Sequence, residues 1–286
     1  MSFEKIYKRI IAIGGVLIIG LLLSIFITLF INSSISIKKF GFSFLINKTW
    51  DPVFENFGAF PFIVGTLLTS IISLIISIPF SLSVSLFIGE YYKDTIFSKI
   101  FETFIEILAV IPSVVFGLWG LFYLAPIVRN LQIKFSLPPT GVSVFTASLV
   151  LSIMIIPYTI SVGKEVIKLI PTDLKEAAFS FGATHYEVIK KIILPYAKSG
   201  IIAGFLLSFG RAIGETMAVT MVIGNVNTIP RSIFLPGNTI ASVIANEFLE
   251  AITKIHISAL IELALILFVI TFILNLIANN IIKKVV

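Results

Sequence analysis

The chain has 286 residues, of which 57% are hydrophobic and only 13% are charged, and its mean hydropathy is +1.08. These values lie far outside the range of soluble globular domains and predict a protein that resides in a lipid bilayer. The net charge of +6 comes with no cysteine, which excludes a disulfide framework, a cysteine nucleophile and a cysteine metal site.

Long apolar stretches follow one another along the chain, and a helix needs roughly 20 residues to cross the hydrocarbon core. Five stretches without a charged residue are long enough: 11–37, 56–89, 107–128, 135–163 and 263–282. A sixth, from 199 to about residue 224, is equally apolar except for Arg211 and Glu215 near its middle. The first stretch follows a basic start but is too long for a signal peptide. We therefore predict an all-α polytopic membrane protein with six transmembrane helices.

The basic residues predict the orientation, because Lys and Arg are enriched in cytoplasmic loops. With six crossings, the N-terminus, the segment around residues 90–99, residues 164–198 and the C-terminus share one side. Thirteen Lys and Arg residues lie on that side, and seven lie on the other. We expect a multi-pass protein of the cell (inner) membrane, in contact with lipid, with both termini cytoplasmic. Nucleic-acid binding is not expected, because the basic residues flank spans and form no patch.

The longest predicted cytoplasmic segment, residues 164–198, is here named the coupling segment. Pro171 excludes one continuous helix, so a first short helix should begin with Thr172 or Asp173 as N-cap. Gly182 supplies a turn, and residues 184–187 have the capping-box spacing that starts a second helix. Leu194-Pro195 should close this unit before the fifth span.

Three features of the coupling segment resemble the EAA signature of permeases of ATP-binding-cassette importers. They are Glu176-Ala177-Ala178, Gly182 four residues later, and Leu194-Pro195. The resemblance implies that this segment carries the coupling helix, which docks on a cytoplasmic ATPase subunit. Small alanines allow close helix approach, and Glu176 can meet a basic rim. The alternative is an ordinary amphipathic helix on the membrane surface.

The run 210–218 places Arg211 and Glu215 in the predicted fifth span. A lone Arg at the centre of a span costs about 2.5–3.5 kcal/mol, so it needs a partner, and Glu215 follows one turn later. Helical projection puts Ser208 on the same stripe, which should face a pathway. Two interpretations remain open. Arg211 and Glu215 form a buried salt bridge that only keeps the helices in register, or the planar guanidinium of Arg211 donates hydrogen bonds to an anion in transit. The candidate translocation-path residues are Ser208, Arg211, Glu215 and Thr216.

Several further segments resemble one branch of this class, the phosphate-importer permeases of the PstC type. They are Trp50-Asp51-Pro52 and residues 57–67, 111–120, 211–218 and 244–247. The resemblance implies a type I ABC importer permease fold with a five-helix core plus an N-terminal helix. It also implies a second homologous permease subunit, two ATP-binding subunits and an extracytoplasmic phosphate-binding protein. Arg211 and Glu215 match the charged positions that this family links to phosphate passage.

We divide the chain into residues 1–55, the N-terminal transmembrane helix and first external loop, and residues 56–286, the permease core. No Walker, nucleophile-elbow or H-E-x-x-H motif is present, so no catalytic or metal site and no cofactor are expected in this chain. ATP and Mg would be bound by the partner ATPase. The function indicated is a phosphate-importer permease. The alternatives are an importer for another solute such as sulfate or molybdate, an ion-coupled secondary carrier, and, most distantly, a membrane-embedded enzyme.

Overall fold

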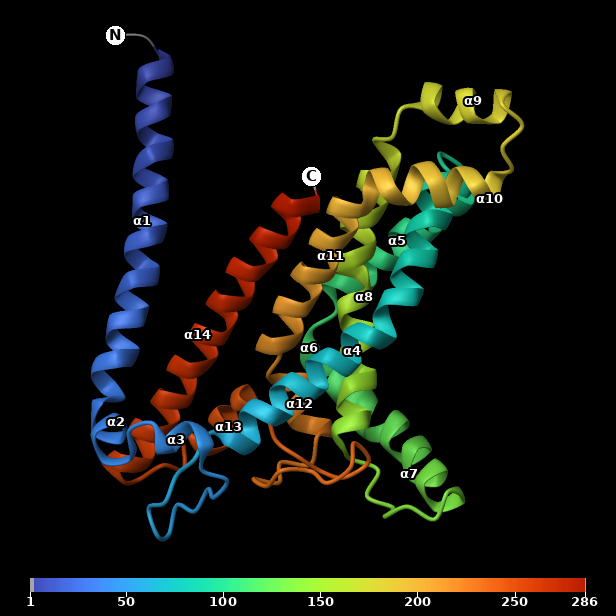
Figure 1. The fold of residues 1–286 in the computed structure, drawn as a ribbon. Helices are drawn as coiled ribbons and strands as arrows, with labels where there is room; N and C mark the ends of the chain where they lie inside the picture. Colours follow the sequence, from blue (N-terminus) through green and yellow to red (C-terminus); the bar gives the residue numbers. More distant parts are fainter. Residues whose placement is uncertain (1–2, 286) are drawn as a thin grey trace.

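The computed structural model describes residues 3–285, which form helices joined by loops, with no named strand in that range (Figure 1). Six helical segments of this described part are long and apolar enough to cross a bilayer. They are Tyr7–Asn32, Phe60–Tyr91, Ser113–Lys134, Val144–Lys168, His185–Gly214 and Lys254–Lys283. The predicted all-α protein with six spans is therefore confirmed.

The first helix stands apart from the others. α1 (Phe3–Asn32) approaches α14 (Lys254–Val285) near its own C-terminal end, where the rings of Phe26 and Phe268 lie 5.9 Å apart. The opposite end of α1 is well separated from the bundle (Figure 1). Two short helices then lie across the end of the bundle, α2 (Ser34–Phe40) and α3 (Ser43–Ile46).

Small side chains allow the two central helices to pack closely. α4 (Phe60–Leu86) continues into the π-helical turn η1 (Phe87–Tyr91) and packs along α8 (Val144–Lys168). A row of buried hydroxyl residues recurs every three or four positions of α4, on one face of the helix. These residues are Thr66, Thr69, Ser70, Ser73, Ser77, Ser81 and Ser85. Small residues let helix backbones approach each other, which places this face at the centre of the core.

The third span differs from the prediction of residues 107–128. α5 (Ile96–Val110) ends before Ile111, and a new helix, α6 (Ser113–Trp119), begins after Pro112. Proline lacks an N–H and disfavours a helical conformation in the preceding residue, and Ile111 has an extended ψ of 126°. The span instead runs through α6, the π-helical turn η2 (Gly120–Leu124) and α7 (Ala125–Lys134).

The fifth span begins and ends earlier than the predicted 199–224. α11 (Leu194–Gly214) continues directly from α10 (His185–Val188) and the π-helical turn η3 (Ile189–Ile193). Pro195 lies in the first turn of α11, where its missing N–H is tolerated, so Leu194-Pro195 does not close the unit as predicted. After Gly214 the chain turns at Glu215, whose ψ is 125°, and α12 (Met217–Val222) starts a separate helix.

The other four spans also have different bounds. The first is Tyr7–Asn32 instead of 11–37, and the second is Phe60–Tyr91 instead of 56–89. The fourth begins at Val144 instead of residue 135, because Pro138, Pro139 and Gly141 occupy the intervening loop. The last begins at Lys254 instead of residue 263, because α14 continues through Glu262, whose side chain is buried. Apolar runs in the sequence thus located the helices but not their ends.

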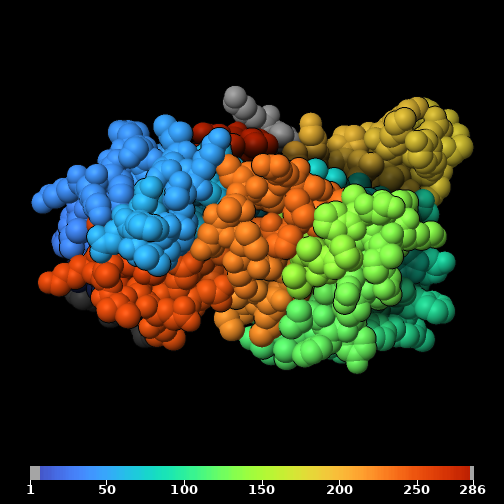
Figure 2. All heavy atoms as spheres, turned by 90° about the horizontal axis from the view of Figure 1, so that it is seen from below, coloured from blue at the N-terminus to red at the C-terminus, as the bar shows by residue number. Residues whose placement is uncertain are grey.

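The loops divide between the two ends of the bundle. The beginning of α1, the end of α14 and the coupling-segment helix α9 (Thr172–Ser180) lie at the same end (Figure 1). This is the grouping that six crossings predicted. At the other end, the first loop, the segment that includes α13 (Ile240–Glu247) and α7 lie side by side in the view from below (Figure 2).

Candidate functional site

The turn that ends α9 has the hydrogen bonds of a Schellman motif. The N–H of Gly182 donates to the carbonyl of Phe179 at 2.9 Å, and the N–H of Ala183 donates to the carbonyl of Ala178 at 3.1 Å. Gly182 has a φ of +82°, a left-handed conformation that glycine adopts without a Cβ penalty. The Schellman motif therefore explains why a glycine follows Ala178 by four residues, at the position that needs a left-handed conformation. The predicted turn at Gly182 is confirmed.

The two helices of the coupling segment begin differently. Thr184 and Glu187 form the predicted capping box, in which Thr184 Oγ1 accepts from the Glu187 N–H at 3.3 Å and Glu187 Oε2 accepts from the Thr184 N–H at 3.0 Å. The N-cap of α9 is Pro171, not Thr172 or Asp173. Pro171 has an extended ψ of 134°, so the helix begins directly after it, without a side-chain cap.

α9 packs one face on the core and leaves the other uncovered. Ala178 and Leu194 are partly buried and pack against the same cluster of buried apolar side chains. On the other face Glu176 and Ala177 are exposed, and Phe181 at the turn is 93% exposed. Figure 1 shows α9 beyond the ends of α8 and α11, at the end of the bundle where both termini lie. Exposed apolar groups of this kind mark interaction sites, so this face is a candidate docking surface.

The sequence did not indicate how α9 is attached to the second span. Lys175 of α9 is buried and forms an ion pair with Glu90 of η1. The ring of His185 stacks on Phe179, with centroids 5.9 Å apart, and lies 4.8 Å from the ring of Tyr91 in η1. Residues 85 positions apart thus meet only in the folded chain.

Arg211 and Glu215 come together at the end of α11, not in the middle of a span as predicted. The Arg211 Nη2 and Glu215 Oε2 atoms are 3.6 Å apart, and the Arg211 guanidinium lies 4.9 Å from the centroid of the Tyr158 ring of α8. A cation in the last turn of a helix is favoured by the free carbonyl groups there. Glu215 Oε1 in turn accepts from the Ala218 N–H at 3.4 Å. We name Arg211, Glu215 and Tyr158 the Arg211 site.

The two residues of the Arg211 site differ in exposure. The Arg211 side chain is 39% exposed, whereas the Glu215 side chain is 7% exposed. A separation of 3.6 Å is longer than a hydrogen bond, so the guanidinium keeps donors for another acceptor. The arrangement can therefore hold an anion beside Arg211.

The other two predicted path residues lie in different surroundings. Ser208 is fully buried against α8, where its Oγ lies 2.6 Å from Thr159 Oγ1 and donates to the Ile155 carbonyl at 3.1 Å. This position contradicts the expectation that Ser208 faces a path, because interhelical hydrogen bonds occupy its hydroxyl. Thr216 is partly exposed, and its Oγ1 donates to the Gly214 carbonyl at 3.2 Å. Of the four, only Arg211, Glu215 and Thr216 lie together.

Two segments that carry the PstC-type resemblance meet at Glu247, at the end opposite α9. Trp50 Nε1 donates to Glu247 Oε2 at 2.8 Å, and His256 Nε2 lies 3.0 Å from the same oxygen. Asn227 Nδ2 donates to Glu247 Oε1 at 2.9 Å. One carboxylate therefore joins the first loop, the loop after α12 and the start of α14. Trp50 and residues 244–247 both stand out in the sequence, but no local signal pairs residues 197 positions apart.

Comparison with known proteins assigns the chain to a family. A sequence model described as "Binding-protein-dependent transport system inner membrane component" matches residues 81–286. The chain belongs to this family. A "Phosphate transport system permease protein PstC" from Haemophilus influenzae is 42% identical and covers 98% of this chain and 93% of its own length. A protein of the same name from Mesorhizobium japonicum is 39% identical over 99% of this chain and 90% of its own length.

Solved structures of two ABC transporters share the fold. A chain of a bacterial alginate ABC transporter superposes with a TM-score of 0.64 at 19% identity, covering 100% of this chain and 98% of that chain. A chain of the MetNI methionine ABC transporter gives a TM-score of 0.60 at 15% identity, covering 83% of this chain and 100% of that chain. The chain therefore has the type I ABC importer permease fold that the resemblance implied.

Proposed function

We propose that this chain is the membrane-spanning permease subunit of an ATP-driven importer and forms part of the path for inorganic phosphate. The observation that carries the proposal is the Arg211 site, where a half-exposed guanidinium is held by an ion pair longer than a hydrogen bond. A planar, permanently charged donor fork suits a phosphate anion. The names and near-complete coverage of the PstC relatives support the same substrate.

The Arg211 site suggests how an anion passes. Glu215 holds the guanidinium while the path is empty, and an arriving anion takes the free donors. The Tyr158 ring stabilises the cation in both states through its π face. In this proposal Arg211 exchanges the Glu215 carboxylate for the arriving anion, so its charge always has a negatively charged partner.

The exposed face of α9 supports docking on a cytoplasmic ATPase. The exposed residues Glu176, Ala177 and Phe181 lie at the end of the bundle that both termini share, and the Schellman motif fixes the angle between α9 and α10. In this proposal both termini, which share that end, are cytoplasmic. A second homologous permease, two ATP-binding subunits and an extracytoplasmic phosphate-binding protein complete the importer. ATP and Mg are bound by the ATPase, and this chain contributes no catalytic residue.

Uptake of labelled phosphate into proteoliposomes tests the proposal. The vesicles contain this chain, its partner permease and the ATPase, and the binding protein is supplied outside. We expect uptake that requires both internal ATP and the binding protein. Uptake without ATP would identify an ion-coupled carrier instead. ATP-dependent movement of sulfate or molybdate without phosphate would retain the fold and coupling and overturn the substrate.

A further inference from the structure

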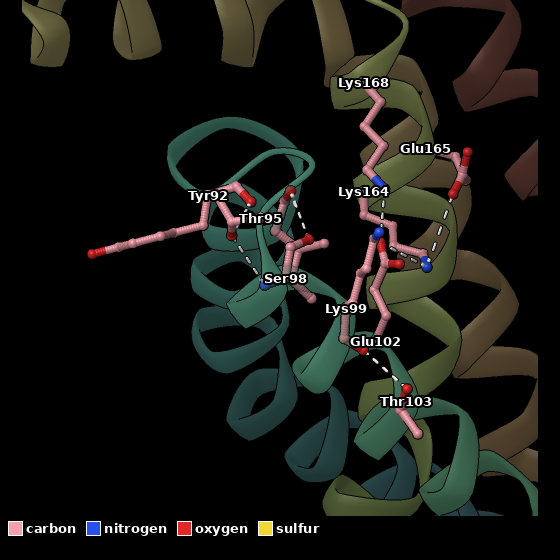
Figure 3. Close-up of polar contacts among 10 residues, drawn as sticks. Tyr92, Thr95, Ser98, Lys99, Glu102, Thr103, Lys164, Glu165 and Lys168 are labelled. Carbon is pink, nitrogen blue, oxygen red and sulfur yellow. Dashed lines mark hydrogen bonds and ion pairs between the residues drawn. The ribbon is translucent and has the colours of Figure 1, made fainter.

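Ion pairs join the same two stretches of chain at two places near α9. Glu90 of η1 pairs with Lys175 of α9, and their side chains are 8% and 9% exposed. Glu102 of α5 pairs with two lysines near the end of α8: its Oε1 lies 2.7 Å from Lys168 Nζ and 3.3 Å from Lys164 Nζ (Figure 3). Both carboxylates lie within residues 87–102, and all three lysines lie within residues 164–175. We name these five residues the coupling clamp.

The coupling clamp resists separation more than it stabilises the fold. A buried ion pair contributes little net stability, because both charges lose their hydration. Removing one partner is different, since the other charge would then remain buried and unpaired. For Glu90 and Lys175 this penalty applies whichever side chain is removed. Moving α9 away from η1 would break this pair and open the packing that buries it, so we expect the two elements to move together.

The clamp connects α9 directly to η1, and it connects the end of α8, just before α9, to α5. η1 continues α4, so the Glu90 contact reaches the second span. The Glu102 contact links α5 to the end of α8, from which the chain leads into α9. Aromatic contacts follow the same route, because His185 bridges Phe179 of α9 and Tyr91 of η1. Direct side-chain contacts therefore link α9 to η1 and α4, and the end of α8 to α5.

We propose that the coupling clamp transmits movement of α9 to α4 and α5, so that these elements move as one body during transport. Its five members are positioning residues, since none of them needs to touch ATP or phosphate. The inference rests on the proposed function, in which α9 receives its movement from an ATPase. It adds which side chains carry that movement into the membrane.

Charge reversal across the buried pair tests the clamp. Glu90→Lys and Lys175→Glu are compared singly and together in the full importer complex, reconstituted in proteoliposomes. The readout is phosphate transported per ATP hydrolysed. We expect each single variant to lower this ratio by about fivefold, the size of effect that contacting residues show, and the double variant to return within about twofold of the wild type. Single variants that assemble and keep the wild-type ratio would overturn the clamp.

Lys191→Ala is the matched control. Lys191 pairs with Glu187 at 2.9 Å on an exposed face, four residues away in the same continuous helix, so the pair joins no two elements. Exposed pairs of this kind contribute little, and the ratio should stay within about twofold of the wild type. A control that falls as far as Lys175→Glu would contradict a specific role for the clamp.

A cross-linking experiment covers single variants that fail to assemble. The chain has no cysteine, so Glu90→Cys and Lys175→Cys introduce the only two thiols of this subunit, and the other subunits are used in cysteine-free form. We expect the doubly substituted complex to be uncoupled, and a short thiol-reactive cross-linker to restore phosphate transport per ATP by tying α9 to η1. Transport that stops when the bridge forms would overturn the clamp, because the elements would then have to separate.

The wild-type complex, measured in parallel, distinguishes the two proposals. If it shows no ATP-dependent phosphate uptake, the proposed function fails and the clamp fails with it. If it is coupled and the reversal variants are coupled too, only the clamp fails.

Discussion

Substitutions of Gly182 test why this position needs glycine. The reason is either its left-handed backbone conformation or a close contact with a partner chain. The residue has a φ of +82°, and a Cβ added there would meet nothing within 4 Å. Any penalty within this chain therefore comes from the left-handed conformation and not from a clash. That conformation costs an L-residue about 1–2 kcal/mol, and a β-branched residue more, whereas asparagine adopts it readily.

We expect Gly182→Val to lower phosphate transport per ATP most, Gly182→Ala less, and Gly182→Asn least. Gly182→Val should release the Schellman turn, change the angle between α9 and α10, and lower phosphate transported per ATP, with insertion and assembly intact. Gly182→Asn should stay near the wild type. Gly20→Ala is the control, since this helical glycine of α1 also has open space around it. Alanine there should be neutral or stabilising, by about 0.5–1 kcal/mol.

The assay is uptake and ATP hydrolysis in the same proteoliposomes, with complex assembly measured by size-exclusion chromatography. Full coupling in Gly182→Val would refute the reasoning, because the turn would then not need glycine. Equal damage in the Asn and Val variants would also refute it. That result would place the requirement in a close contact with the ATPase.

Three further predictions concern other parts of the chain. Arg211→Ala should abolish phosphate uptake while the complex still assembles, and Arg211→Lys should restore only part of it, because a lysine lacks the planar fork; loss of the assembled complex on chromatography would favour a purely structural salt bridge. Gly65→Ala should destabilise the protein by about 1–3 kcal/mol in thermal unfolding, since its Cβ would overlap the backbone carbonyl of Asn238; an unchanged Tm would contradict that packing. The hydrogen bond from Lys168 lowers the pKa of Glu102 below 4.5, so the stability from this pair is present above pH 4.5 and is lost as the pH falls through the lowered value. In Glu102→Gln, Tm should therefore fall less steeply than in the wild type as the pH is lowered below 4.5, and an unaltered dependence of Tm on pH would count against the pair.

Local signals in the sequence determined the break at Pro171, the turn at Gly182 and the start of α10, although the N-cap of α9 and the role of Leu194-Pro195 were predicted wrongly. Pro171, Gly182 and the Thr184 capping box act within a few residues, through missing donors, a left-handed φ and short side-chain hydrogen bonds. Helix ends inside apolar runs were predicted less well. The break at Glu215 is an example, because apolar composition alone does not distinguish one long helix from two short ones.

The sequence by itself determined that the chain crosses the membrane six times, because only helices with enough apolar residues satisfy their backbone groups in lipid. It also identified Arg211 and Glu215 as a pair, since one helical turn separates them. Tertiary structure alone decided which charges meet across the bundle. Packing between distant segments joins Glu90 to Lys175 and Trp50 to Glu247. The periodicity within a single helix carries no information about which residues of other segments will meet it.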